Sequence, residues 1–136
     1  MSVHHATILR YFNEVWNAGQ VDVLDELLTP DYLNHSASLL DVAPGPDGLK
    51  PIVLAMRDGI PDLHYEILDI VGGSDRVAVY TRVTGTHTGT LFGMAPSGRA
   101  FDVRQMQIEQ LRGGRICQHW RITDELALLR QLGQLA

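Results

Sequence analysis

Three side chains near the C-terminus, those of Asp124, Gln105 and Gln107, could perform acid–base chemistry together. A carboxylate that lines an apolar pocket loses hydration, so its pKa rises and it exchanges protons more readily near neutral pH. A neutral amide can hydrogen-bond a ligand carbonyl without bringing a second charge into the pocket. We therefore predict Asp124 and Gln105 as catalytic residues and Gln107 as a substrate-binding residue. Asp124 has a second interpretation, as the N-cap of a helix that begins at Glu125.

Two strands that meet at Gly113-Gly114 would bring these residues together. A two-glycine turn favours a tight hairpin, and strand side chains alternate between the two faces of a sheet. Counting outward gives the pairs Leu111–Ile116, Gln107–Trp120, Gln105–Ile122 and Val103–Asp124. All of them then share one face, on which Trp120 is the candidate for stacking against a substrate. A register slip would instead turn both glutamines to solvent and put Met106 and Ile108 inside.

Two histidines extend the predicted site. His87, in "GTHTG", falls by alternation on the apolar face of its strand and could donate to an enolate oxygen as a catalytic residue. Its alternative is a structural histidine that bonds the backbone in a strand bend. His35 could bind the substrate or hold the following loop, whereas His119 alternates with Trp120 and should point outward. Because these residues stand singly on separate elements, the spacing predicts no metal site.

The remaining sequence indicates helices first and strands afterwards. A helix over 3–18 carries an apolar stripe that includes Tyr11 and Trp16, which are predicted to pack in the core and to line part of a pocket. Further helices are expected over 22–28, 47–57 and 125–134, with long antiparallel strands between 63 and 123. This order is typical of an α+β domain, in which a strongly curved sheet can wrap around the helices.

Length and composition exclude several classes of protein. The chain has 136 residues, enough for one domain with a sizeable core. A net charge of -5 leaves no basic surface for nucleic acid or anionic lipid, and no apolar run is long enough to cross a bilayer. The one cysteine, Cys117, cannot form an internal disulfide, which favours a cytoplasmic location. Neither a G-x-S-x-G motif nor a Walker A or Rossmann glycine pattern is present.

Five segments together are specific enough to suggest a family. They are "VWNAGQVDVLDELLTPDYLNH", "IPDLHYEILDIV", "DRVAVYTRVTGTHTG", "LFGMAPSGRAF" and "GRICQHWRITD". On these segments the chain resembles the SnoaL-like polyketide cyclase family of the nuclear transport factor 2-like superfamily. The resemblance implies a cone-shaped α+β barrel with an open pocket, assembly into homodimers or larger homo-oligomers, and acid–base chemistry without a cofactor. It also implies Asp124 as the general acid/base and His35 at the pocket mouth.

The residues and the resemblance together predict a polyketide or ester cyclase that closes a ring by an aldol-type reaction. Asp124 would remove a proton from a carbon between carbonyls, and Gln105 with His87 would stabilise the oxyanion that forms. Two alternatives stay open: a module that binds a small apolar ligand without catalysis, and an isomerase, dehydratase or hydroxylase of the same fold. Apolar Met106 and Ile108 on the opposite sheet face predict a contact with a second subunit.

Overall fold

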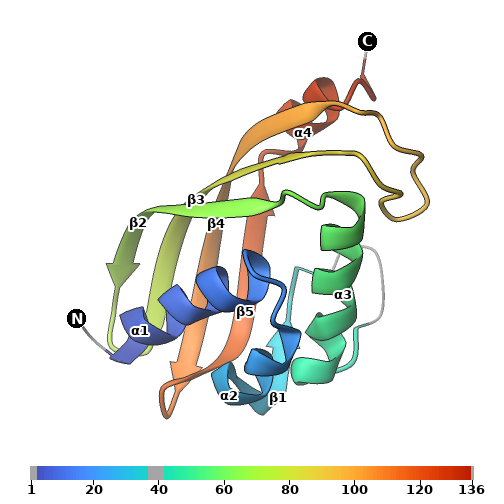
Figure 1. Ribbon diagram of the computed structural model, residues 1–136. Coiled ribbons are helices and arrows are strands. Elements are labelled where there is room, and N and C mark those ends of the chain that lie inside the picture. Colours follow the sequence, from blue (N-terminus) through green and yellow to red (C-terminus); the bar gives the residue numbers. More distant parts are fainter. Residues whose placement is uncertain (1–2, 37–41, 136) are drawn as a thin grey trace.

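The computed structural model describes residues 3–36 and 42–135, which form several helices and a five-stranded sheet (Figure 1). The helical segments are α1 (Val3–Arg10), a π-helical turn (Tyr11–Trp16), a 3-10 turn (Val21–Val23), α2 (Leu24–Leu27), α3 (Pro46–Gly59) and α4 (Glu125–Gln131). The strands are β1 (Leu28–Asn34), β2 (His64–Gly72), β3 (Arg76–Thr86), β4 (Ala100–Arg112) and β5 (Arg115–Thr123). The predicted α+β class is confirmed.

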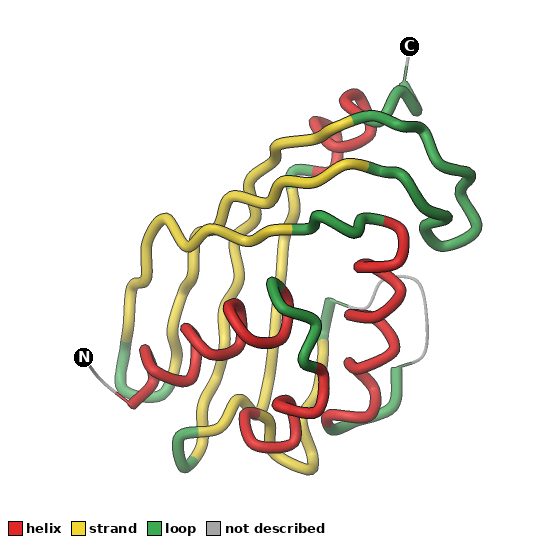
Figure 2. Tube along the Cα trace, viewed as in Figure 1, coloured by secondary structure: helices red, strands yellow, loops and turns green. Residues whose placement is uncertain are grey.

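The strands follow the order β1-β5-β4-β3-β2 across the sheet. The pairings from β2 to β5 are antiparallel as predicted, whereas β1 at the edge runs parallel to β5. Register shifts interrupt the β1–β5, β2–β3 and β4–β5 pairings, and such irregularities increase the local bend and twist of a sheet. Figure 2 shows the resulting curvature, with the strands bending over α1. The predicted wrapping of a curved sheet around the N-terminal helices is therefore confirmed.

The apolar stripe of the first helix packs into the hollow of the sheet. Tyr11, Phe12 and Trp16 are buried, and the helix widens there into a π turn in which the Asn17 N–H donates to the Phe12 carbonyl at 2.8 Å. The rings of Phe12 and Trp16 lie 5.4 Å and 5.2 Å from the ring of Tyr65 on β2. Centroid distances of this size are favourable for aromatic pairs. The stripe thus forms a core that fixes the position of Trp16.

Helix α3 closes one side of the hollow (Figure 1). Gly45 precedes it with a φ of 82°, and an added Cβ would lie 2.6 Å from the Pro30 carbonyl oxygen, so only glycine fits there. Pro46 occupies the first turn, where proline is favourable, and Pro51 lies inside the helix. Within 3–36 and 42–135, no helix combines the length and the apolarity that a membrane span requires.

The β4–β5 hairpin differs from the prediction by one residue. Its turn at Gly113-Gly114 has positive φ at both glycines, and Leu111 faces Ile116 as predicted. Cys117 is then an extra residue on β5, which makes a β-bulge. Beyond it the partners are Gln110–Gln118, Glu109–His119, Ile108–Trp120, Gln107–Arg121, Met106–Ile122 and Gln105–Thr123. The predicted pairs beyond the bulge were therefore wrong, because one extra residue sends every later side chain of β5 to the other face.

Candidate functional site

The bulge places three polar cross-strand pairs side by side on the concave face of β4 and β5. These pairs are Gln105–Thr123, Gln107–Arg121 and Glu109–His119. The β4 member of each pair is buried. Trp120 and Ile122, which were predicted to face the pocket, point to the convex face instead. The concave face of the hairpin is consequently more polar than the sequence count indicated.

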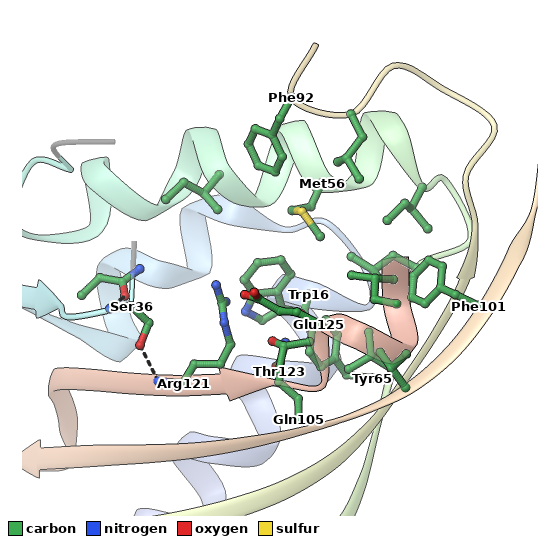
Figure 3. Close-up of a pocket in the computed structure, with 18 of the residues that line it drawn as sticks. Trp16, Ser36, Met56, Tyr65, Phe92, Phe101, Gln105, Arg121, Thr123 and Glu125 are labelled. Carbon is green, nitrogen blue, oxygen red and sulfur yellow. Dashed lines mark hydrogen bonds between the residues drawn. The ribbon is translucent and has the colours of Figure 1, made fainter. Parts of the chain in front are cut away.

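A cavity of about 260 Å³, open to solvent on one side, lies between this face and α3 (Figure 3). Its walls are mainly apolar and include the side chains of Trp16, Met56, Tyr65, Phe92 and Phe101. Its polar lining residues are Asn34, Ser36, Gln105, Arg121, Thr123 and Glu125. A mostly apolar hollow with a few polar groups is the usual form of a small-molecule site, and this one is slightly smaller than the usual range of about 300–1,000 Å³.

Hydrogen bonds fix the polar floor of the cavity. The Gln105 Nε2 donates to Thr123 Oγ1 at 2.9 Å, and the Gln107 Nε2 donates to Gln105 Oε1 at 2.5 Å. Gln107 itself is buried and stands outside the set of lining residues, so it supports Gln105 from behind. Because Thr123 Oγ1 accepts from Gln105, its own O–H can be directed toward a ligand. The floor therefore presents an oriented hydroxyl and an amide.

Two charged side chains line the cavity, Arg121 and Glu125. Arg121 comes from β5 and Glu125 from the first turn of α4, and Figure 3 shows both entering the space between β5 and α3. The Ser36 hydroxyl accepts a hydrogen bond from the backbone N–H of Arg121 and so holds this part of β5. Within the described parts of the chain, no ion pair links the two side chains. The cavity thus contains a cation and a carboxylate that are both open to a ligand.

The third cross-strand pair lies deeper and outside the cavity lining. His119 Nδ1 and Glu109 Oε1 are 2.6 Å apart, and both side chains are almost completely buried. Burial raises the pKa of Glu109, and the neighbouring His119 opposes that rise. Burial likewise raises the pKa of Tyr11, which the Glu109 charge reinforces. These groups form a polar cluster inside the core. His119 was predicted to point outward, and this was wrong because the bulge at Cys117 reverses the faces of β5.

Asp124 does not line the cavity. It is exposed at the N-terminus of α4, where its Oδ1 accepts the Ala127 N–H at 3.2 Å. The predicted pairing with Val103 on the pocket face was wrong, because β5 ends at Thr123 and the bulge has already reversed its faces. The alternative interpretation as a helix cap describes its contacts. The carboxylate among the described lining residues belongs to its neighbour Glu125.

The other predicted site residues divide between the cavity and its surroundings. Trp16 and Gln105 line the cavity, whereas Tyr11 packs edge-on against Phe12 in the core. His87 is buried outside the lining, and its Nδ1 accepts the Ser97 N–H at 3.3 Å, as in the structural alternative.

Two residues that were predicted to bind substrate, His35 and Trp120, lie against each other. His35 stacks on Trp120 at 4.8 Å between ring centroids and contacts Gln118 Oε1 at 2.7 Å. Neither His35 nor Trp120 belongs to the cavity lining. Across 3–36 and 42–135, no three His, Cys, Asp or Glu side chains group as a metal site would need.

Arg121, Thr123 and Glu125 line the cavity but were not among the predicted site residues. One signal could have found two of them. Glu109 falls on the same face as Gln105 and Gln107 by simple alternation, and a buried glutamate requires a partner. Only a register that turns His119 inward supplies one, and that register also turns Arg121 and Thr123 inward.

Comparison with known proteins agrees with this architecture. The family model described as SnoaL-like polyketide cyclase matches residues 6–132. The chain belongs to the SnoaL-like polyketide cyclase family. Nogalonic acid methyl ester cyclase of Streptomyces nogalater is 31% identical over 87% of this chain and 89% of its own length. Aklanonic acid methyl ester cyclase of Streptomyces peucetius is 28% identical over 93% and 89% of the two chains.

Solved structures of relatives share the whole fold of this SnoaL-like chain. TsrD from Streptomyces laurentii superposes with a TM-score of 0.88 at 27% identity, covering 99% of this chain and 98% of TsrD. IdmH from Streptomyces antibioticus gives a TM-score of 0.82 at 31% identity, covering 96% and 98%. These relatives support the assignment of the chain as an enzyme of the cyclase type.

Proposed function

We propose that this SnoaL-like protein closes a ring in a small polyketide-like substrate by an intramolecular aldol reaction that needs no cofactor. The observation that carries the proposal is the position of the Glu125 carboxylate in an apolar cavity that also contains the Thr123 hydroxyl and the Gln105 amide. The names of the two curated relatives, which are cyclases of polyketide-derived methyl esters, support the same reaction class.

In the proposed reaction, Glu125 removes a proton from a carbon that lies between two carbonyl groups of the substrate. The electron pair left on that carbon forms the new C–C bond by attacking a further carbonyl carbon of the same molecule. The C=O π electrons become an alkoxide, and protonated Glu125 returns its proton to that oxygen. No atom is lost, so the product is an isomer of the substrate. A proton between two carbonyls is acidic enough for a carboxylate base in an apolar site.

The floor of the cavity would assist both steps. Thr123 and Gln105 can donate hydrogen bonds to the oxygen on which negative charge develops, and their mutual bond holds them in place before the substrate arrives. The aromatic walls would hold the substrate folded, which replaces a slow random encounter by a close approach of the two reacting carbons. The open side of the cavity leaves room for the rest of a longer substrate. This mechanism assigns no proton transfer to Asp124 or His87.

The test is the Glu125→Gln variant assayed for turnover of a confirmed substrate. Loss of the base should lower kcat by about 10²- to 10⁴-fold, because general base catalysis contributes that much. Asp124→Asn is the matched control, since it removes a carboxylate one residue away and keeps the capping oxygen; its kcat should equal that of the wild type. If Asp124→Asn loses turnover and Glu125→Gln keeps it, the base is Asp124. Tight ligand binding by the wild type without any product would favour a binding module.

The convex face of the sheet is proposed to join a second copy of the chain. Tyr80, Met106 and Ile122 form one cross-strand row there and are 37%, 47% and 79% exposed. Ile108 and Trp120 form the next row. Apolar rows of this kind favour a symmetric interface. Light scattering should give twice the chain mass, and Ile122→Asp should shift the protein to monomer. A wild type that is monomeric at high concentration would contradict this interface.

A further inference from the structure

Phe92 adopts a backbone conformation that is unfavourable for its residue type. Among the described residues it is the one non-glycine residue with a positive φ, at 45°. In this left-handed region an L side chain crowds the backbone, so a phenylalanine costs free energy that a glycine or an asparagine would largely avoid. Such strain persists only where the surrounding structure imposes it, and it is concentrated at functional sites. The conformation of Phe92 therefore indicates a role for this residue beyond folding.

A tight turn in the segment 87–99, between β3 and β4, imposes the conformation. Leu91 and Met94 exchange backbone hydrogen bonds of 3.1 Å and 2.8 Å. Phe92 and Gly93 lie between them with φ of 45° and 82°. This is the pattern of a type I′ turn, whose first central position favours asparagine, aspartate or glycine. Both arms of the turn are held in place, because Leu91 is buried and Met94 packs against the core.

The ring of Phe92 contributes little to the core. Phe92 is 46% exposed and lies outside the cluster of buried apolar residues, but it lines the cavity. Of the exposed large apolar residues that the structure describes, it is the one in that lining. Figure 3 shows Phe92 on the side of the cavity away from Gln105 and Thr123. A ligand on the polar floor of the cavity would therefore have this ring on its other side.

We propose that Phe92 is a specificity-determining residue, whose ring packs against a flat face of the polyketide-like substrate when the substrate occupies the cavity. This inference rests on the proposed function, because it concerns the substrate of the same cavity. Aromatic rings pack favourably on other flat rings, and a ligand would remove the exposed ring from water. The strained phenylalanine thus makes the free protein less stable than an asparagine would, whereas it makes the complex with a flat ligand more stable.

The experiment measures binding without turnover, with methyl 6-hydroxy-2-naphthoate, a flat and uncharged ester, as a fluorescent probe at pH 7. Phe92→Asn should weaken binding by about three- to thirtyfold, because an aromatic contact and the apolar area that it covers are both lost. Phe92→Tyr keeps the ring and should bind about as tightly as the wild type. Leu54→Ala is the matched control, because Leu54 is a similarly exposed apolar residue outside the cavity lining, and its affinity should be unchanged.

Urea unfolding without ligand gives a second readout that separates a ligand contact from a core side chain. Phe92→Asn should raise the urea midpoint, because asparagine accepts a positive φ more readily and little buried surface is lost. Phe101→Ala is the contrasting variant, since Phe101 lines the same cavity but is buried. Its loss should lower both the affinity for the probe and the urea midpoint.

Three outcomes would overturn the inference: no binding of the probe by the wild type up to its solubility limit, an affinity of Phe92→Asn equal to that of the wild type, or a lower urea midpoint for Phe92→Asn. The result is separate from the cyclase proposal, because the probe has no carbon between two carbonyls and cannot be cyclised. If affinity depends on Phe92 and no substrate is cyclised, the contact stands and the proposed reaction fails. If a substrate is cyclised and Phe92→Asn binds the probe as the wild type does, the reaction stands and this inference fails.

Discussion

The concave face of the β4–β5 hairpin has two ends that contain charged groups in opposite situations. At the closed end, Glu109 and His119 are both buried, are bonded to each other at 2.6 Å and do not belong to the lining of the cavity. At the open end, Arg121 and Glu125 line a cavity and have no ion pair with each other. The bulge at Cys117 turns both His119 and Arg121 to this face of β5, whereas Glu125 reaches the cavity from α4.

The difference shows that burial alone does not identify a functional group. In the buried pair Glu109 Oε1 is bonded to His119 Nδ1, and the charge of Arg121 also acts on Glu109, so this arrangement is explained by the stability of the core. The less buried Arg121 and Glu125 line the cavity, where a ligand can reach them, and that is the mark of a binding site. Changes at the closed end should therefore affect stability first, whereas changes at the open end should affect binding and turnover.

The largest expected effect on stability is that of His119→Leu. This change leaves the Glu109 carboxylate buried without its partner, and breaking one side of a buried ion pair costs about 3–5 kcal/mol in the free energy of unfolding. Urea denaturation at pH 7 measures it. His64→Leu is the matched control, because His64 is an exposed residue on β2, and its effect should stay within about 0.5 kcal/mol.

The pH dependence of His119→Leu tests the same interpretation. His119 lowers the pKa of Glu109, so its removal leaves burial to raise that pKa further above the ordinary value of 4.5. A carboxyl group whose pKa is raised in the folded state loses stability as the pH increases through that pKa. The destabilisation relative to wild type should accordingly be smaller at pH 5 than at pH 8. An equal loss at both values would mean that Glu109 is not the source.

The sequence was sufficient for the architecture because the fold depends on long, repeated patterns. The apolar stripe around Trp16, the two-glycine turn and the alternation along β4 each involve many residues, so one irregularity does not change the result. The parallel position of β1 beside β5 could not be predicted in the same way. It depends on where a short strand docks in three dimensions, which no local pattern specifies.

The site was predicted less well because it depends on a single residue. Counting by twos places Gln105 correctly, since β4 has no irregularity next to β3. The same counting fails on β5 after Cys117. It predicts Trp120 on the inner face, where Arg121 lies instead. Trp16 was identified because its helical stripe is insensitive to such a shift. No glycine or proline stands at the bulge position itself, so in the sequence only the need of Glu109 for a partner indicates the bulge.

A smaller effect on stability is expected at Asp124, the N-cap of α4. Asp124→Ala removes the side-chain oxygen that accepts the Ala127 N–H, and loss of an N-cap costs about 1 kcal/mol. Asp124→Asn keeps a capping oxygen and should cost less. Thermal or urea unfolding of both variants measures the difference. If Asp124→Ala is as stable as the wild type, the capping hydrogen bond does not stabilise the folded protein.

The smallest effect is expected on the convex side of the same hairpin, where charges are exposed as well as paired. Asp102 on β4 contacts Arg82 at 2.6 Å and Arg104 at 2.9 Å, and the hydrogen bond from Arg82 is the main cause that lowers the pKa of Asp102 from 3.8 to about 2. A lowered pKa in the folded state means that the contribution to stability is present above about pH 3.8 and disappears as the pH falls toward about 2.

Surface ion pairs contribute little, so Asp102→Asn should lower the urea midpoint only slightly at pH 6. The difference in urea midpoint between Asp102→Asn and the wild type should disappear near pH 2. Other carboxylates titrate in both proteins and would not change this difference. Asp69→Asn, an exposed aspartate on β2 without an ion pair among the described residues, should show no such convergence. A loss of stability for Asp102→Asn as large as that for His119→Leu would mean that exposure does not weaken charge pairs on this hairpin. The contrast between its buried and exposed charges would then have no physical basis.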